Sequence, residues 1–531
     1  MGHTIGHMFD DSLYRSDDTT GETSPDETLA EAETGFNKLF PDLDPFDKDQ
    51  DFNDVLGRLR LLGRKGGPMD ADDPLITMVN PLDANLNCHP TDINVKCNPD
   101  NDNPEMTVGF TFLGQFLDHD ITFDTQKLDL TDPPKPNLRS PFFDLDSVYG
   151  GGPSADPLLD EDKRLYDEDM PAKLRLDLNA PRDLPRDSTQ RAIIADPRND
   201  ENVIISQLQL AFLKFHNLVV DHILKQHPEL IDHPGELFEE ARRTVRWHHQ
   251  YIIVNQFLKA TLDSEVYEQV KEKGPTVFLP SPNPQMPREF QIAAYRFGHS
   301  QIRPGYKINI GFGAPIFDAA LDARDDNDPN TPLDTDPNDL RGGRRAPRRF
   351  VEWDTFFDFG TQEVGIKDGH PVVQPKVKRN KRIDPFISSP MFDLPFGPGL
   401  PGPEDHIRTL AGRNLERHLQ HHLASGQAIA GALGFPPLTP AETAELEPLN
   451  FHQSTPLWWY ILKEALVQQK GRRLGKVGSR IIAEVFFGLL LSDENSYWST
   501  DKNWKPTLPQ RNGTIGENFT MTDLLTFARV A

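Results

Sequence analysis

The sequence predicts a mainly α-helical fold with long loops and little β structure, on three observations. Apolar residues recur at spacings of three and four, as in helices packed against a core, over residues 203–224, 236–262, 287–300, 443–468 and 476–491. Alternating, strand-like segments are few and short. The chain also holds 47 prolines, which indicates long ordered loops between the helices.

The 531 residues contain no internal repeat and are predicted to form one large domain with a short arm. Residues 1–33 are acidic and poor in apolar anchors, so we expect a flexible N-terminal arm. The domain is then predicted to span residues 34–531. Within it, residues 318–349 carry an acidic block followed by a basic one, which favours a charged surface insertion over a binding segment.

The formal net charge of −26 argues against nucleic acid or an anionic membrane surface as a partner, because either would need a basic face. No stretch approaches the roughly 18 consecutive apolar residues of a membrane span. The first residues lack the basic and apolar regions of a secretory signal peptide. We therefore expect either a cytoplasmic location or secretion without a classical signal peptide.

The two cysteines, Cys88 and Cys97, lie in a polar segment. Their spacing and number do not fit a zinc site. A disulfide and a pair of free thiols both remain open.

One helical segment concentrates the polar chemistry. Gln115 and His119 are four residues apart, so they share one helix face, and Asp118 and Asp120 flank that face. Taken alone, this segment also fits a metal cluster or a solvated charged face.

Five segments in one order resemble the motifs of the animal-type haem peroxidases, within the peroxidase–cyclooxygenase superfamily. They are Gly-Gln-Phe-Leu-Asp-His-Asp at 114–120, Ser-Pro-Phe-Phe-Asp-Leu-Asp-Ser-Val-Tyr-Gly at 140–150, Ala-Asp-Pro-Arg-Asn-Asp-Glu at 195–201, Tyr-Arg-Phe-Gly-His at 295–299 and Arg-Asn-Leu-Glu-Arg at 413–417. The resemblance covers roughly residues 34 to 531. It implies a single helical haem-peroxidase domain that binds haem b.

The resemblance assigns catalytic roles on the peroxide side of the haem. His119 would take a proton from peroxide and return it to the departing oxygen. Arg198 would stabilise the negative charge that develops on that oxygen. Gln115 would neighbour a bound halide or water.

On the opposite side, the resemblance makes His299 the iron ligand and Asn414 the acceptor of its second ring proton. Arg296 and Arg417 would meet the haem propionates.

Two carboxylates, Asp118 and Glu201, match the positions that form ester bonds to haem methyl groups in the family, which implies a covalently attached haem. Some mammalian members add a methionine linkage at the next position, which is Asn202 here. A sulfonium bond is thereby excluded, and bromide, iodide and thiocyanate are favoured over chloride as substrates.

The resemblance also implies a Ca²⁺ site, with oxygen ligands from Asp120, Ser140, the Phe142 carbonyl, Asp144 and Asp146. An aspartate at the last position departs from the usual loop and adds negative charge. Because Asp120 follows His119, the ion would brace the helix that carries the histidine.

The expected function is a peroxidase that reduces hydrogen peroxide and oxidises halides, pseudohalides or phenolic donors. A fatty-acid dioxygenase of the same superfamily is one alternative, but its radical-forming tyrosine lies three residues before the iron-ligating histidine. That position is Arg296 here, and Tyr295 is one step away. The other alternative is a non-catalytic calcium-binding relative, which would have no need for both His119 and Arg198.

Overall fold

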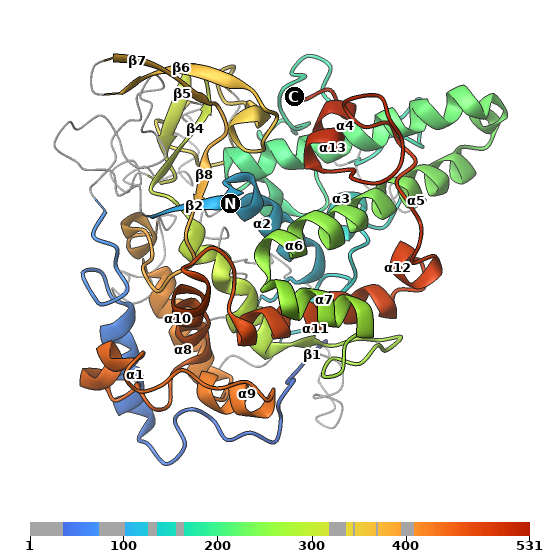
Figure 1. Cartoon of the computed structure of the whole chain (residues 1–531). Coiled ribbons are helices and arrows are strands. Elements are labelled where there is room, and N and C mark those ends of the chain that lie inside the picture. Colours follow the sequence, from blue (N-terminus) through green and yellow to red (C-terminus); the bar gives the residue numbers. More distant parts are fainter. Residues whose placement is uncertain are drawn as a thin grey trace.

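Helices dominate the structure and strands are short, so the predicted mainly α fold is confirmed (Figure 1). The computed structural model describes residues 35–73, 101–125, 135–154, 164–317, 336–343, 346–367, 370–394 and 408–531. The predicted arm at residues 1–33 and both cysteines lie outside the described residues.

The longest helix, α4 (Val203–Gln226), runs through the core. It begins where the Asn202 side chain accepts hydrogen bonds at 3.0 Å from the backbone N–H groups of Ile204 and Ile205, a common helix N-cap. Among the described residues, α4 alone is long and apolar enough to cross a membrane, with a mean hydropathy of 1.4. Since 83% of that stretch is buried inside the protein, this is weak evidence for a span.

Two further predicted helices are confirmed. Residues 236–262 correspond to α5 (Pro234–Ile252), a π-helical turn η8 (Ile253–Leu258) and the short α6 (Lys259–Thr261), which follow one another without a break. Residues 476–491 form α11 (Lys476–Ser492). Helices α4 and α5 lie side by side (Figure 1).

The prediction of one helix over residues 443–468 is wrong. The structure has a short 3₁₀ helix, η15 (Ala444–Leu449), then an irregular segment, then α10 (Leu457–Gln469). Two prolines explain the break, because Pro448 lies within the short helix and Pro456 occupies the N-cap of α10. Proline lacks the N–H group that a continuous helix needs.

The predicted helix at residues 287–300 is also irregular. A π-helical segment, η9 (Glu289–Ala293), gives way to a 3₁₀ segment, η10 (Ala294–Gln301). Side chains bind backbone carbonyls here, since Arg296 Nε donates to Gln291 O at 2.9 Å and Trp458 Nε1 donates to Arg296 O at 3.1 Å. Such departures from α geometry often occur at functional sites.

Every sheet within the described residues has two strands. The parallel pair is β1 (Phe36–Asn37) with β3 (Met286–Pro287), and the antiparallel pairs are β2 (Asp102–Thr107) with β8 (Arg379–Lys381), β4 (Gly305–Asn309) with β5 (Phe312–Pro315) and β6 (Gln362–Lys367) with β7 (His370–Pro375). β2 leads almost directly into α2 (Gly109–Ile121), which packs against α4 and η10.

The remaining helices surround this centre. α8 (Leu410–Gln420) packs on η9 and on α1 (Phe52–Gly63), in the lower left of Figure 1. The other helical elements are α3 (Asp146–Tyr149), η6 (Pro197–Asp200), η7 (Pro228–Asp232), α7 (Ser264–Lys273), η12 (Trp353–Thr355), η13 (Ser389–Phe392), α9 (Gly426–Ala432), α12 (Tyr497–Thr500) and α13 (Met521–Phe527).

The described part of segment 318–349 differs from the predicted solvated surface insertion. Leu340, Arg341 and Arg349 are buried. The backbone N–H of Val203 donates to Leu340 O at 2.9 Å, and that of Gly342 donates to Glu201 O at 2.8 Å. The basic block is therefore partly structural. Arg341 Nε binds the Asp339 carboxylate and Arg349 donates to carbonyls of the same segment, whose backbone contacts the start of α4.

Candidate active site

Helix α2 directs Gln115 and His119 toward one carboxylate, as their spacing predicts. Gln115 Nε2 donates to Glu201 Oε1 at 2.5 Å. His119 Nε2 lies 3.6 Å from the same oxygen. The His119 and Glu201 side chains are each only 3% exposed. Three of the predicted site residues thus meet in one buried cluster.

An asparagine fixes the ring of His119. His119 Nδ1 lies 2.8 Å from Asn199 Oδ1, and Asn199 Nδ2 donates to Gln209 Oε1 at 2.9 Å. The bond to Gln209 orients the Asn199 amide so that its oxygen faces the imidazole. Because a carbonyl oxygen can only accept, the proton resides on Nδ1 and Nε2 carries the lone pair.

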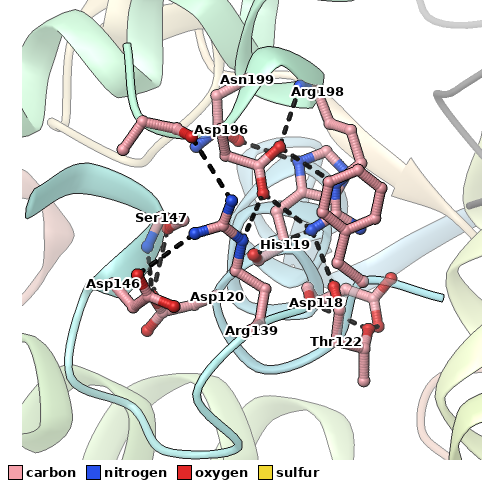
Figure 2. A network of polar contacts seen from close by, with 12 residues as sticks. Asp118, His119, Asp120, Thr122, Arg139, Asp146, Ser147, Asp196, Arg198 and Asn199 are labelled. Carbon is pink, nitrogen blue, oxygen red and sulfur yellow. Dashed lines mark hydrogen bonds and ion pairs between the residues drawn. The ribbon is translucent and has the colours of Figure 1, made fainter. Parts of the chain in front are cut away.

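Arg198 is buried against the end of α2 (Figure 2). Its Nη2 donates to the carbonyls of His119 at 3.0 Å and Thr122 at 2.7 Å. Its Nε and Nη2 also bind the carboxylate of Asp196 at 3.0 and 2.8 Å. The guanidinium therefore neighbours the backbone of His119 and satisfies carbonyls that the helix leaves without partners.

Asp196 lies between two arginines. Arg139 Nε is 3.0 Å from Asp196 Oδ2, on the other side from Arg198. Burial opposes ionisation, yet the charges of Arg198 and Arg139 hold the pKa of Asp196 well below its usual value. Arg139 also binds Asp146 at 3.1 Å, so it joins the loop of residues 140–146 to η6 (Figure 2).

Asp118 lies on the half-buried side of α2, next to Tyr295. Thr122 Oγ1 donates to Asp118 Oδ1 at 3.1 Å. Burial and the charge of Asp118 raise the pKa of Tyr295 well above its usual value. The Tyr295 hydroxyl donates to Gly114 O at 3.1 Å and so links η10 to α2.

The second predicted histidine, His299, is also held by an asparagine. Its Nδ1 lies 2.7 Å from the side-chain amide nitrogen of Asn414, which comes from α8. Rotating that amide by half a turn places its oxygen at the same point, where it accepts the Nδ1 proton and leaves Nε2 as the metal-binding nitrogen. The indole of Trp458 packs edge-on at 6.2 Å between ring centres.

Buried arginines gather on the same side as His299. Arg296 and Arg417 are 8% and 1% exposed, and Arg417 Nη1 is 3.9 Å from Asp124 Oδ2. Arg288 binds the same carboxylate at 2.8 Å. Buried cations require nearby negative charge. Asp124 supplies part of it, and the two propionates of a haem would add to it.

The predicted calcium residues come together around one loop. Asp120 accepts from the backbone N–H groups of Leu145 at 3.1 Å and Ser147 at 3.3 Å. Ser140 Oγ donates to Asp144 Oδ2 at 3.0 Å, and Ser140 N donates to Asp146 Oδ2 at 3.0 Å.

These carboxylates repel one another. Burial, followed by the charges of Asp144 and Asp146, raises the pKa of Asp120. Burial and Asp146 raise the pKa of Asp144 to about 6. Phe142 belongs to the same loop. No group of three or more acidic, histidine or cysteine side chains in the described ranges is arranged closely enough to hold a metal ion.

The positions and contacts of the two histidines bear on whether these residues fit a haem. His119 and His299 are both buried, come from different elements, and each has Nδ1 bound by an asparagine amide. A haem needs one nitrogen as the iron ligand and one base on the opposite face. The donor set therefore fits a haem, with buried arginines available for its propionates.

Sequence reasoning missed Asn199, Gln209 and the Arg139–Asp196 pair. Asn199 directly follows Arg198 within the segment matched to the family, so its position was a usable signal. Nothing in the sequence relates Arg139 to Asp196, because they are distant in the chain and meet only through folding.

Known proteins support the same assignment. Residues 133–311 match the model of the animal haem peroxidase family. The chain is 33% identical to dual oxidase from Drosophila melanogaster over 115 residues. This alignment covers 21% of this chain and 7% of that protein. Curated relatives are matched over 6% to 38% of their own length.

Two solved structures share the fold. Peroxidase A from Dictyostelium discoideum aligns with a TM-score of 0.51 and 17% identity, covering 86% of this chain and 92% of that chain. The fatty acid α-dioxygenase of Oryza sativa aligns with a TM-score of 0.50 and 15% identity, covering 74% and 70%. At these identities the likeness concerns the fold alone.

Proposed function

Because the chain belongs to the animal haem peroxidase family, we propose that it binds haem b and uses hydrogen peroxide to oxidise small donors. The donors would be bromide, iodide, thiocyanate or phenols. One observation carries the proposal: each of two buried histidines has its Nδ1 within 2.8 Å of an asparagine side-chain amide, a contact that would leave Nε2 as the reactive nitrogen.

The bound haem would supply the iron that polarises peroxide and accepts its oxidising equivalents. His119 Nε2, held as the free base by Asn199, removes a proton from peroxide and returns it to the leaving oxygen. Arg198 provides a fixed positive charge beside the His119 backbone, where negative charge develops on oxygen. Gln115, on the same helix face as His119, would orient a small anion or a water molecule.

On the other side, His299 would bind the iron through Nε2. Asn414 would accept the Nδ1 proton, which fixes the tautomer and makes the ligand more basic. Arg296 and Arg417 would neutralise the propionates.

Two further features belong to the same proposal. Asp118 and Glu201 lie on either flank of His119 and would form ester bonds to haem methyl groups. Ca²⁺ would bind oxygen atoms of Asp120, Ser140, Phe142, Asp144 and Asp146, because these hard ligands lie where the loop of residues 140–146 meets α2, and the ion would relieve the repulsion between the carboxylates. Because Arg139 binds both Asp146 and Asp196, an ordered calcium loop would also hold Asp196 and its partner Arg198 in place.

Absorption spectroscopy of the haem-loaded protein tests the function. A Soret band that survives extraction with acidified acetone, together with peroxide-dependent bromination, is the expected result. His119→Ala should retain the band and lower the rate of reaction with peroxide by about 10²–10⁴-fold. His299→Ala should lose the band or shift it strongly.

The dioxygenase alternative has a direct test, because that fold is also shared. Oxygen consumption with a long-chain fatty acid, without any peroxide-dependent oxidation of bromide or phenol, would replace the peroxidase proposal. Absence of haem binding under ample haem supply would favour a non-catalytic relative.

A further inference from the structure

Tryptophan and tyrosine side chains form a cluster that reaches the surface where α5 meets α12 and the loop after it. Trp504 lies 5.3 Å from Trp247, 5.6 Å from Tyr497 and 6.2 Å from Tyr251 between ring centres. Tyr497 is in turn 5.8 Å from Trp498. Tyr497 and Trp498 are buried, whereas Trp247, Tyr251 and Trp504 are partly exposed. We call these five residues the aromatic cluster.

The aromatic cluster is connected to the candidate active site through α11. The ring of Trp498 lies 5.3 Å from Phe487, and the neighbouring Phe486 lies 5.3 Å from Tyr295. Tyr295 belongs to η10, which carries His299, and its hydroxyl binds Gly114 O beside Gln115. Phe487 and Phe486 are adjacent residues of α11, so packed side chains lead from the surface to η10, the segment that carries His299. Figure 1 shows α11 running toward α12 below α5.

Tyrosine and tryptophan are the side chains from which one electron is most readily removed, whereas phenylalanine is far harder to oxidise. Electron transfer over short gaps is fast, and its rate falls steeply with distance. The rings of the aromatic cluster and of Tyr295 thus provide steps for electron movement, with Phe487 and Phe486 as the medium between Trp498 and Tyr295.

Direct contact between a bulky donor and the peroxide side is prevented by burial. The side chains of His119 and Glu201 are each 3% exposed, and Asn202 is fully buried. Peroxide and a halide are small enough to reach such a site, but a phenol carried on a large molecule is not. A donor of that kind needs another place to deliver its electron.

We propose that the aromatic cluster is a surface oxidation site for bulky phenolic donors, an inference that rests on the proposed peroxidase function. Hydrogen peroxide is the oxidant. It takes up two electrons and two protons to give two water molecules. Trp504 or Trp247 passes one electron to the candidate active site through the packed rings and takes one electron from a phenol at the surface. The phenol also loses its hydroxyl proton, so two phenols become two phenoxyl radicals for each peroxide.

The test compares the variant Trp247→Phe/Trp504→Phe with the unchanged protein, both loaded with haem. The probe is a phenol attached to a large polyethylene glycol chain. The double variant should oxidise this probe at least about tenfold more slowly. The absorption change on mixing with peroxide alone should keep its rate. Trp353→Phe, which alters a buried tryptophan outside the path, serves as the control and should behave like the unchanged protein.

Mass spectrometry gives a readout independent of turnover. One equivalent of peroxide without donor should leave oxidised residues in the peptides that contain Trp247 and Trp504, and none at Trp353. Equal oxidation at Trp353, or an unchanged rate with the polymer-bound phenol, would overturn the surface site while the peroxide reaction remains intact. No absorption change with peroxide in any of the proteins would overturn the peroxidase function, and the surface site with it.

Discussion

At the scale of single residues, the orientation of His119 depends on Asn199. The hydrogen-bond partner of His119 Nδ1 is the neutral amide oxygen of Asn199, and Gln209 holds that amide in turn. A neutral partner fixes the tautomer without favouring the protonated imidazole. This arrangement keeps Nε2 available as a base.

Replacing Asn199 should therefore act on proton transfer. Asn199→Ala leaves the Nδ1 proton without its acceptor, and loss of a buried hydrogen bond costs about 1–3 kcal/mol, or about fivefold to a hundredfold in rate. Asn199→Asp should restore the orientation. Its negative charge would favour protonated His119, so the loss of rate at low pH should begin at a higher pH than in the unchanged protein.

Stopped-flow measurement of the peroxide reaction across pH checks both variants. Asn255→Ala, which removes a partly exposed asparagine outside the site, controls for a general loss of stability. A rate and pH profile in Asn199→Ala equal to those of the control would show that Asn199 has no part in proton transfer.

At the scale of elements, the start of α4 is held by a segment more than a hundred residues further along the chain. Leu340 and Gly342 bind the backbone of Val203 and Glu201. A Cβ on Gly342 would come within 1.7 Å of Asp200 O, so only glycine permits this approach. The position of Glu201 thus depends on a glycine in a segment that composition assigns to the surface.

Gly342→Ala should displace η6 and the first turn of α4. We expect a lower melting temperature, from about 1–3 kcal/mol of overpacking, together with incomplete ester formation at Glu201. Gly57→Ala is the matched control, because nothing lies within 4 Å of its added methyl group in α1, and it should stabilise the helix by about 0.5–1 kcal/mol. Thermal unfolding and acidified-acetone extraction measure the two effects. Equal behaviour of the two variants would contradict this account.

Elements differed in how well the sequence predicted them. Periodicity was sufficient for α4, α5 and α11, because burial on repeated faces is what periodicity records. It failed at residues 443–468, where Pro448 and Pro456 interrupt the backbone despite a continuous apolar pattern. It also missed the π and 3₁₀ geometry at residues 287–300, where the side chain of Arg296 binds the Gln291 carbonyl and that of Trp458, from α10, binds the Arg296 carbonyl.

The candidate site was predicted only through the resemblance to a family. Spacing alone placed Gln115 and His119 on one face. No local pattern relates His119 to Asn199 or His299 to Asn414, since these pairs are 80 and 115 residues apart. Their contacts arise because α2 meets η6 and η10 meets α8.

At the scale of the whole molecule, buried neutral histidines make the fold sensitive to acid. Burial, the largest cause in each case, lowers the pKa of five histidines to between about 2 and about 4: His216, His248, His249, His418 and His421. Each of these groups takes up a proton more readily in the unfolded chain, where its pKa is near 6.5. Stability is therefore full above about pH 6.5 and falls as pH decreases toward the folded values.

His249→Leu should weaken this dependence. His249 lies edge-on to Phe212 at 5.1 Å and is fully buried, and neither ring nitrogen has a hydrogen-bond partner among the residues that the structure describes. Between pH 6.5 and 5, removing it should reduce the loss of unfolding free energy by about 2 kcal/mol. Urea unfolding at the two pH values measures the slope. An unchanged dependence of the unfolding free energy on pH would mean that the pKa of His249 is the same in the folded and the unfolded chain.

The contacts of His119 also bear on how this protein is made. Gln115, His119, Arg198, Asn199 and Gln209 are all synthesised before His299 and Asn414. At about 5–20 residues per second, the ribosome needs about 10 to 40 s to travel from Gln209 to Asn414. Throughout that time no haem can be held between two histidines. In the folded protein, the residues that are synthesised first hold one another's polar groups through His119–Asn199–Gln209 and Arg198–Asp196. A cell can therefore supply haem to finished chains, without matching its delivery to translation.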